Sequence, residues 1–224
     1  MSRIILASAS PRRKELLEQV GLEFEICPAK GEEIITKTIP SEVVMELSKQ
    51  KAEEVASLVL SFGEQNPEIV TPQDILVIGA DTIVAYDGQI LGKPKDEEDA
   101  KKMMRMLQGN THSVYTGVTF VFIDKSGRTG EIVFFEQSDV TMWPISEKDI
   151  CAYVEVEETS FSGNWRDNAG GYGIQDPFGL MYIKGISGDY NNVVGLPVAR
   201  IYQELLRLGI DWYLWLYLIH KKAL

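Results

Sequence analysis

The sequence predicts an α/β protein built around one mixed β-sheet, and two observations lead to this. Short apolar runs typical of buried strands alternate with amphipathic stretches typical of helices. The connections between the apolar runs are of two kinds, helical crossovers and tight hairpins, so the sheet should contain parallel and antiparallel strands. The composition, 45% hydrophobic and 25% charged, is ordinary for a folded chain of 224 residues. We find no internal repeat and expect one folding unit over residues 1–224.

The N-terminal segment predicts a strand, a turn and a helix. Arg3–Ala7 is a short apolar run, and Pro11 stands where the first residue of a helix is expected. Apolar residues recur on one face over Ser10–Val20, and Gly21 ends the helix. Leu22–Cys27 alternates as a second strand.

Arg12 and Arg13 occupy the first turn of this helix, which is an unfavourable place for a cation. The helix macrodipole disfavours each by about 0.3–1 kcal/mol. A bound anion would offset this cost, because free amides at a helix start, two guanidinium groups and the hydroxyl of Ser8 make a phosphate site. The alternative is a capped helix whose arginines pair with surface acids such as Glu15, and the pattern alone favours neither.

A long helix, a linker and a hairpin follow. Ser41–Phe62 carries apolar residues along one side and predicts an amphipathic helix. Residues 63–74 are rich in helix breakers and are the best linker candidate. Ile75–Ile78 predicts the strongest strand, and Thr82–Tyr86 with Gln89–Leu91 predicts a hairpin around an Asp-Gly turn.

The next segment continues the mixture of helices and strands. Asp96 opens a helix that Gly109 closes. Two long alternating strands are expected over His112–Asp124 and Glu131–Trp143, and Ser146–Val156 predicts another helix.

The C-terminal part is less regular. Residues 157–171 are polar and glycine-rich, which is typical of a loop. Tyr172–Gln175 and Met181–Ile186 predict strands, and Leu196–Leu208 predicts the last clear helix. The apolar tail of residues 210–220 is too short to span a bilayer, so a docked helix or strand, or a partner surface, is expected there.

Charge and cysteine content restrict the class of protein. The net charge is −11, from 22 Lys and Arg against 33 Asp and Glu, and such a surface repels a nucleic acid polymer while leaving room for a small anion in a basic pocket. Cys27 and Cys151 lie far apart and make neither a disulfide framework nor a zinc site, which indicates a reducing compartment. The start of the chain lacks the apolar core of a secretory signal, so a cytoplasmic location is expected, with no membrane contact.

One carboxylate is the main candidate for chemistry. Asp81 follows the strongest strand in a Gly-Ala-Asp-Thr run, which should place it at the carboxyl edge of the sheet, where α/β proteins put their ligands. Its carboxylate could hold Mg²⁺, act as general base, or do both. The alternative is that Asp81 simply caps a turn.

Other charged residues could complete a site around Asp81. Lys93 lies between a glycine and a proline, and together with Lys51 from the long helix it would supply point charges for a triphosphate. Glu32 and Glu33 follow a glycine in a loop and are either further metal ligands or simply solvated acids. Gln175 ends a segment with three glycines, and its amide can pair with the edge of a nucleobase.

Two reaction types are disfavoured by the residues present. The chain has two histidines, neither next to a nucleophile-bearing elbow, so no Ser-His-Asp arrangement is credible. The strand end with a nucleophilic aspartate that forms a phosphoenzyme is absent as well. Metal-activated water remains.

Six motifs occur in an order and spacing that resembles the Maf family of nucleoside triphosphate pyrophosphatases. They are SASPRR, GADT, GKP, TGV, GGYGIQ and GDYNNVVGLP. The resemblance covers almost the whole chain. It implies an elongated α/β fold of the Maf and inosine-triphosphatase kind, with two lobes around a cleft, a bent mixed β-sheet flanked by helices, and usually a homodimer.

The resemblance also implies a reaction and roles for residues. The reaction is hydrolysis of a nucleoside triphosphate to monophosphate and pyrophosphate with a divalent metal, Mg²⁺ or Mn²⁺. Asp81 matches the general base or metal-associated carboxylate, and Glu33 matches a metal ligand. The matched phosphate contacts are Ser8, Arg13, Lys51 and Lys93. The matched positions that set base choice are Arg12, Thr82 and Gln175, and their identities resemble the branch that acts on dTTP and UTP.

One position departs from the family pattern, and two alternative functions stay open. Asn168 stands where the family usually has Lys, which puts turnover in doubt if that lysine contacts phosphate or orders the loop. The first alternative is a house-cleaning enzyme for altered purine or modified pyrimidine triphosphates. The second is a nucleotide-binding regulator of cell division or growth arrest that binds a protein partner through Trp212–Leu218.

Overall fold

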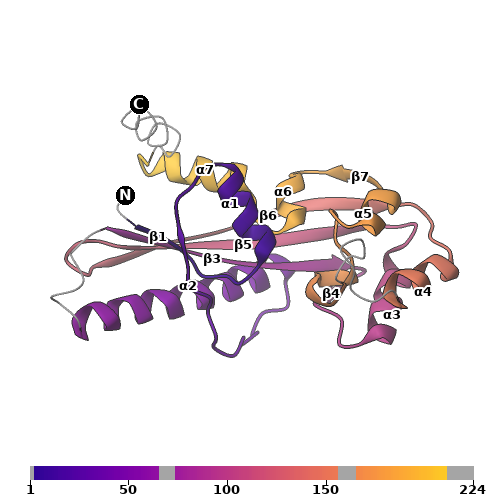
Figure 1. The fold of residues 1–224 in the computed structure, drawn as a ribbon, viewed down its shortest axis with the longest axis horizontal. Coiled ribbons are helices and arrows are strands. Elements are labelled where there is room, and N and C mark those ends of the chain that lie inside the picture. Colours follow the sequence, from indigo (N-terminus) through magenta and orange to yellow (C-terminus); the bar gives the residue numbers. More distant parts are fainter. Residues whose placement is uncertain (1–2, 66–73, 156–164, 211–224) are drawn as a thin grey trace.

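The protein is built on one sheet of seven strands with helices on both faces. The computed structural model describes residues 3–65, 74–155 and 165–210. The strands are β1 (Arg3–Leu6), β2 (Glu25–Ile26), β3 (Ile75–Tyr86), β4 (Gln89–Leu91), β5 (Thr111–Ile123), β6 (Thr129–Met142) and β7 (Ile183–Ser187). The α-helices are α1 (Pro11–Gln19), α2 (Pro40–Gln65), α3 (Glu97–Leu107), α4 (Glu147–Glu155), α5 (Pro177–Tyr182), α6 (Tyr190–Val194) and α7 (Val198–Arg207). Figure 1 shows an elongated molecule with β3, β5 and β6 along its length.

The sheet is mixed, as the sequence predicts. Its order is β2-β1-β3-β5-β6-β7, and β4 pairs with β3 beside β1. β1 runs parallel to β2 and β3, because the connections that leave it and return contain α1 and α2. β3, β5, β6 and β7 form an antiparallel series. The predicted mixed α/β class is therefore confirmed.

One edge of β3 is interrupted at residues 79–83. The pairing of β1 with β3 ends at Leu6 opposite Ile78, and the pairing of β4 with β3 begins at Val84 opposite Leu91. Because β1 is parallel and β4 is antiparallel to β3, the carboxyl ends of both strands point toward this interruption. The prediction that the strand stops at Ile78 was wrong, since β3 continues through it to Tyr86, paired on its other side with β5.

Helix α2 covers one face of the sheet at unusually short range, and two glycines make this possible (Figure 1). A Cβ atom on Gly79 would lie 2.3 Å from the backbone oxygen of Ser48. A Cβ atom on Gly117 would lie 2.1 Å from the backbone oxygen of Val44. Any side chain at these two positions would push the helix off the sheet.

The other face is covered by α1 and α7. Leu17 of α1 and Ile201 of α7 are fully buried in a cluster with Leu76, Ile78 and Ala80 of β3. The alternate residues of β3 contact α2 instead, which is the two-residue period of a strand buried on both faces. A separate cluster at the far end of the sheet joins α3 and α4 to β5 and β6.

Most predicted elements are present, although β2 is shorter than the strand expected over Leu22–Cys27, and further errors lie after residue 171. Tyr172–Gln175, expected as a strand, is irregular and ends in a turn. Asp176-Pro177 then begins α5, so the predicted strand at Met181–Ile186 exists only from Ile183, as β7. Gly179 explains the difference, because a Cβ there would lie 2.2 Å from the backbone oxygen of Gly173, and so the segment folds back on itself. Helix α6 lies where no element was predicted.

Three predictions concern stretches that lie wholly or partly outside this description. The loop expected over residues 157–171 is described only from residue 165. The linker prediction falls largely on residues 66–73, although α2 extends to Gln65. The apolar tail after residue 210 lies outside the described residues. Among the residues that are described, no helix is long and apolar enough to cross a membrane.

Candidate functional site

Two carboxylates and one ammonium group meet at the interruption of β3. Lys51 of α2 forms an ion pair with Asp81, whose side chain is 13% exposed. The same Lys51 Nζ lies 2.8 Å from Oε1 of Glu33, which belongs to the loop between β2 and α2. Glu33 is half-exposed, so this group opens to solvent on one side. The structure thus brings together three residues that are far apart in the sequence.

The close packing of α2 explains why Lys51 reaches Asp81. Gly79 and Asp81 share one face of β3, and Gly117 lies opposite Asp81 on β5. The helix backbone rests on these two glycines, and Ser48 fixes its position with a hydroxyl contact of 2.9 Å to Thr119. Lys51 precedes Ala52, which also packs on Gly79, and its side chain reaches Asp81 because helical side chains tilt toward the N-terminus of the helix.

Arg13 lies on the opposite face of β3 and links three elements. Its guanidinium donates to Ser8 Oγ at 2.9 Å, to Thr82 Oγ1 at 3.0 Å and to the backbone oxygen of Gly195 at 2.8 Å. The side chain is buried, and burial lowers the pKa of Arg13, while the negative charge of Asp81 opposes this shift. The cation at the start of α1 is thus held by hydroxyl and carbonyl oxygens, and no carboxylate of the described residues contacts it.

A chain of buried hydrogen bonds continues from Thr82 through the sheet. Thr82 Oγ1 lies 2.9 Å from Thr116 Oγ1, and Thr116 donates to the backbone oxygen of Asn192 at 3.1 Å. Because a carbonyl only accepts and Thr116 has one proton, Thr116 accepts in its contact with Thr82. Thr82 accepts from Arg13, and its own proton has two acceptors within reach, Thr116 Oγ1 at 2.9 Å and the backbone oxygen of Gly195 at 3.4 Å. The side-chain amide of Asn192 extends the chain to Ser138 on β6 at 3.0 Å. Thr82 accepts from Arg13 at one end of this chain, so the chain helps to hold the Arg13 guanidinium in place.

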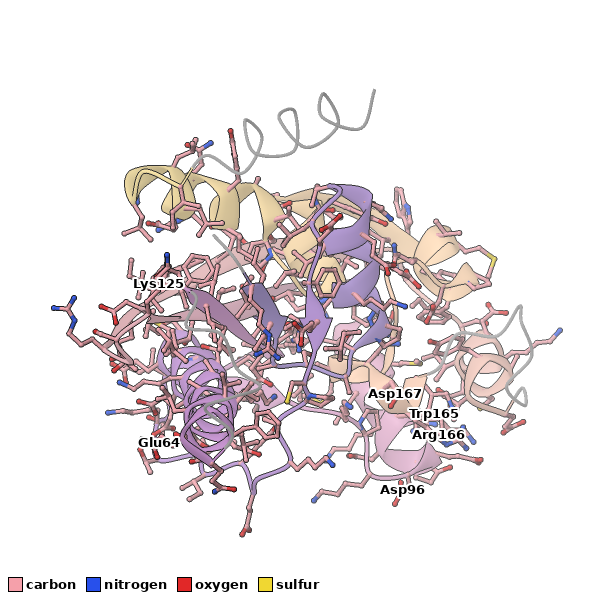
Figure 2. All side chains as sticks on the ribbon, turned by 60° about the vertical axis from the view of Figure 1, so that its left-hand side comes forward. Glu64, Asp96, Lys125, Trp165, Arg166 and Asp167 are labelled. Carbon is pink, nitrogen blue, oxygen red and sulfur yellow. The ribbon has the colours of Figure 1, made fainter. Side chains whose placement is uncertain are left out.

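Two further predicted residues meet on Asp167. Arg12 donates to the backbone oxygen of Asp167 at 3.1 Å, and Lys93 Nζ lies 3.8 Å from its carboxylate. Figure 2 labels Asp167 beside Trp165 and Arg166, close to Asp96 at the start of α3. The amide of Gly170 donates to the oxygen of Gly92 at 3.0 Å, so the glycine-rich segment lies against the residue before Lys93.

The remaining predicted residues are more loosely placed. Gln175 is exposed in the turn before α5 and makes no hydrogen bond to the other predicted residues that the structure describes. Glu32 is exposed in the same loop as Glu33. Asn168 is buried between the two short 3₁₀ turns of residues 165–171.

The donor set at the interruption fits a divalent cation of the Mg²⁺ kind. Asp81 and Glu33 contact one and the same ammonium nitrogen, so a positive charge already lies between them. Mg²⁺ in nucleotide enzymes is held by one or two carboxylates, with waters and substrate phosphates completing its shell. Within the described ranges no group of three or more His, Cys, Asp or Glu side chains is placed to hold a metal by itself.

Comparison with known proteins assigns the family. The model of the family described as Maf-like protein matches residues 3–208. The chain belongs to this family. A Maf-family relative from Agathobacter rectalis, named dTTP/UTP pyrophosphatase, is 69% identical over 211 residues, which cover 94% of this chain and 100% of the relative.

Further Maf relatives carry the same name. A dTTP/UTP pyrophosphatase of Lachnoclostridium phytofermentans is 46% identical, and one of Bacillus thuringiensis subsp. konkukian is 45% identical, each covering 94% of this chain and 98% of the relative. Among solved structures, the Staphylococcus aureus Ham1 protein aligns over 63% of this chain and 72% of its own with 13% identity and a TM-score of 0.36. The Maf assignment therefore rests on the sequence relatives.

Sequence reasoning did not assign a role to three residues of this region. Thr116 is a fully buried hydroxyl of β5, and the available signal for it was its place at the start of the TGV motif. Asn192 is fully buried, and the available signal for it was its place in the GDYNNVVGLP motif. Asp167 comes shortly before the GGYGIQ motif, in which only Gln175 was given a role.

Proposed function

We propose that this Maf-family chain hydrolyses nucleoside triphosphates to nucleoside monophosphates and pyrophosphate, with dTTP and UTP as its substrates. The meeting of Asp81, Lys51 and Glu33 at the interruption of β3 is the observation that carries the proposal. The names of the Maf relatives, dTTP/UTP pyrophosphatase, supply the substrate class.

In the proposed mechanism Asp81 acts as the general base. Its carboxylate takes a proton from a water that attacks the α-phosphorus, a new P–O bond forms, and the bond to the β-phosphate oxygen breaks with pyrophosphate as leaving group. Lys51, Lys93 and Arg13 neutralise the charge that builds on the leaving pyrophosphate. Lys51 exchanges its two carboxylates for a phosphate oxygen when the substrate binds.

Asp81 and Glu33 are also the residues that would hold a divalent cation, Mg²⁺ or Mn²⁺. Such a cation would supply Lewis-acid polarisation of the phosphate oxygens and a water of lowered pKa. Ser8 is a further proposed phosphate contact, and its hydroxyl also accepts from Arg13, which keeps that guanidinium at the edge of β1.

Base choice is assigned to Arg12, Thr82 and Gln175. Gln175 suits this role because its exposed amide has both a donor and an acceptor for a nucleobase edge. Arg12 is held by the backbone of Asp167 and lies on the same side of the molecule as Lys93. Thr82 has its hydroxyl engaged by Arg13 and Thr116, so its part is to orient neighbours.

A panel of nucleoside triphosphates with pyrophosphate detection tests the function. We expect hydrolysis of dTTP and UTP with Mg²⁺ or Mn²⁺ and loss of activity with a chelator. Asp81→Asn should lower kcat by about 10²–10⁴-fold, the usual contribution of a general base. Asp74→Asn, the same change at an exposed residue before β3, is the matched control and should leave kcat unchanged. Near-normal turnover by Asp81→Asn, or a clear preference for GTP analogues, would contradict the proposal.

Three further proposals concern the whole protein. The interruption of β3 marks a cleft between two lobes of one domain, and light scattering should give the mass of a homodimer. The protein acts in the cytoplasm, in keeping with nucleotide substrates and with Cys27 and Cys151, which are free thiols.

A further inference from the structure

The loop that carries Glu33 is held along α2 by three side chains of that helix. Residues 30–36, called the strap here, are exposed and have no regular secondary structure. The strap follows β2, and the segment it belongs to crosses α2 and returns to the start of that helix (Figure 1). Water could satisfy the backbone groups of an exposed strap, so the hydrogen bonds that they make to α2 instead order this loop.

The three side chains come from one face of α2. Glu54 accepts from the amides of Lys30 and Gly31 at 2.8 and 3.0 Å. Glu46 accepts from the amide of Thr36 at 2.9 Å and from its hydroxyl at 2.5 Å. Glu46 and Glu54 are separated by eight residues, with Gln50 midway between them, and residues four apart lie on the same helix face.

Gln50 binds both backbone groups of one strap residue. Its Oε1 accepts from the amide of Ile34 at 3.0 Å, and its Nε2 donates to the oxygen of Ile34 at 2.6 Å. A primary amide side chain has a donor and an acceptor side by side, so it matches an extended backbone residue as a neighbouring strand would. The strap runs antiparallel to α2. Two residues of extended chain span about 6.6 Å, and four residues of helix rise by roughly 6 Å, so Ile34 and Thr36 can bind Gln50 and Glu46 respectively.

These contacts fix the residue next to Ile34. Glu33 contacts Lys51, which follows Gln50 in the helix, so two adjacent helix residues hold two adjacent strap residues. A displacement of Ile34 would move Glu33 away from Lys51 and Asp81. The side chains of Glu46, Gln50 and Glu54 have no contact with Asp81 among the described residues, so any effect on chemistry must pass through the strap.

We propose that Gln50, assisted by Glu46 and Glu54, is a positioning residue that places the Glu33 carboxylate for the divalent cation. The inference rests on the proposed function, which assigns Glu33 to that cation. Residues that orient a metal-ligating group change metal affinity by about 10–100-fold when they are removed. The strap thereby couples the cation site to one face of α2.

The test compares Gln50→Ala with Gln65→Ala, the same substitution at the exposed last residue of α2. We expect faster hydrogen exchange of the amides over residues 30–36 in Gln50→Ala only. We also expect a Mn²⁺ dissociation constant, measured by electron paramagnetic resonance with a non-hydrolysable dTTP analogue, about 10-fold higher than in Gln65→Ala. Gln50→Glu keeps the acceptor and loses the donor to Ile34, and should weaken Mn²⁺ binding in the same direction without shortening the side chain.

A second background separates positioning from general loosening of the fold. In Glu33→Gln, which lacks the carboxylate to be placed, adding Gln50→Ala should change Mn²⁺ binding by less than about twofold. Unchanged Mn²⁺ binding in Gln50→Ala and Gln50→Glu, unchanged exchange of the strap amides, or an equal loss in the Glu33→Gln background would each overturn the inference. A wild-type protein that binds Mn²⁺ with the analogue but releases no pyrophosphate from dTTP or UTP would instead overturn the proposed function.

Discussion

At the scale of the residue, the hydroxyl of Thr116 illustrates how one buried polar atom orders its neighbours. It is fully buried and joins Thr82 to the backbone of Asn192. The hydrogen bonds that run from Arg13 through Thr82 to Asn192 therefore depend on it. Asp81 lies next to Thr82 in β3, on the opposite face. The two faces of one strand therefore carry the two halves of the candidate site, one built on Arg13 and one on Lys51.

Replacement of Thr116 by Val keeps the shape of the side chain and removes the hydroxyl. We expect the free energy of unfolding to fall by about 1–2 kcal/mol, because Thr82 loses the nearer of its two acceptors and the backbone oxygen of Asn192 loses one donor in a buried place. The backbone oxygen of Asn192 still accepts from the amide of Gly195 at 3.0 Å, which limits the loss of stability. Urea unfolding measures the change in the free energy of unfolding.

Thr111→Val is the matched control for this substitution. Thr111 is on the same strand, and its hydroxyl contact with Thr141 at 2.8 Å is exposed to solvent. A change within about 0.5 kcal/mol is expected there. An equal loss of stability in the two variants would mean that the buried hydrogen bonds of Thr116 stabilise the fold no more than the exposed contact of Thr111 does.

His112 gives a prediction about pH. It is buried on β5, its Nε2 lies 2.5 Å from the hydroxyl of Tyr172, and burial lowers its pKa to about 4 from 6.5. Since the unfolded state takes up the proton at higher pH than the folded state, the stabilisation by neutral His112 is complete above pH 6.5 and is lost as the pH falls toward 4. The full loss is about 3 kcal/mol.

The measurement is the free energy of unfolding from pH 7.5 to 4.5 for the wild type and for His112→Gln. Other groups titrate equally in both proteins, so the difference between the two curves isolates His112. We expect the wild type to lose more stability than the variant on acidification. Parallel curves would show that His112 is not buried in its neutral form.

At the scale of the element, the contact of α2 with the sheet decides whether Lys51 can reach Asp81. A Cβ on Gly117 would lie 2.3 Å from the backbone carbon of Val44, as well as against its oxygen. These are backbone atoms of a helix, so the element must shift to make room. Such overpacking costs about 1–3 kcal/mol.

Gly117→Ala should therefore lower both stability and turnover, the latter because Lys51 and the strap move with α2. Gly130→Ala is the control, since Gly130 lies in β6 with nothing within 4 Å of a Cβ atom. Thermal unfolding and dTTP turnover are compared in the two variants. Normal turnover in Gly117→Ala would show that the register of α2 on the sheet does not matter for the site.

The elements that could be predicted from the sequence are those with local signals. Asp96 accepts from the amide of Asp99 at 2.9 Å, as expected for a helix cap, and the Asp-Gly turn of the hairpin has positive φ at both positions. The strand proposed at Tyr172–Gln175 failed because the close packing of Gly179 against Gly173, which bends this segment, depends on tertiary structure. Apolar periodicity does not record such contacts.

The candidate site shows the same difference between residues with a local sequence signal and contacts that depend on tertiary structure. Asp81, Glu33, Lys51 and Lys93 were proposed from motifs, and the structure places the first three in contact. Asp81 was expected at a strand end, whereas it lies inside a continuous strand beside the end of β1. Gln50 was missed, although Glu46, Gln50 and Glu54 recur every four residues, because a polar face on a long helix ordinarily faces water.

At the scale of the whole molecule, the proposed site is located by the interruption of β3. Two strands, β1 and β4, end there from opposite directions, and each is followed within two residues by a proposed phosphate contact, Ser8 and Lys93. The chain as a whole carries a net charge of −11, so the cations gathered at this place form a local exception. A short polyphosphate is suited to such a site, whereas a nucleic acid polymer meets the acidic surface around it.

The most direct test of the central claim is the position of the bond that the enzyme breaks. Hydrolysis of dTTP in H₂¹⁸O with Mg²⁺, followed by mass spectrometry of the products, shows which phosphorus the water attacks. We predict that the ¹⁸O atom is found in dTMP and that pyrophosphate is unlabelled. Label in pyrophosphate, or release of dTDP and inorganic phosphate, would contradict the account.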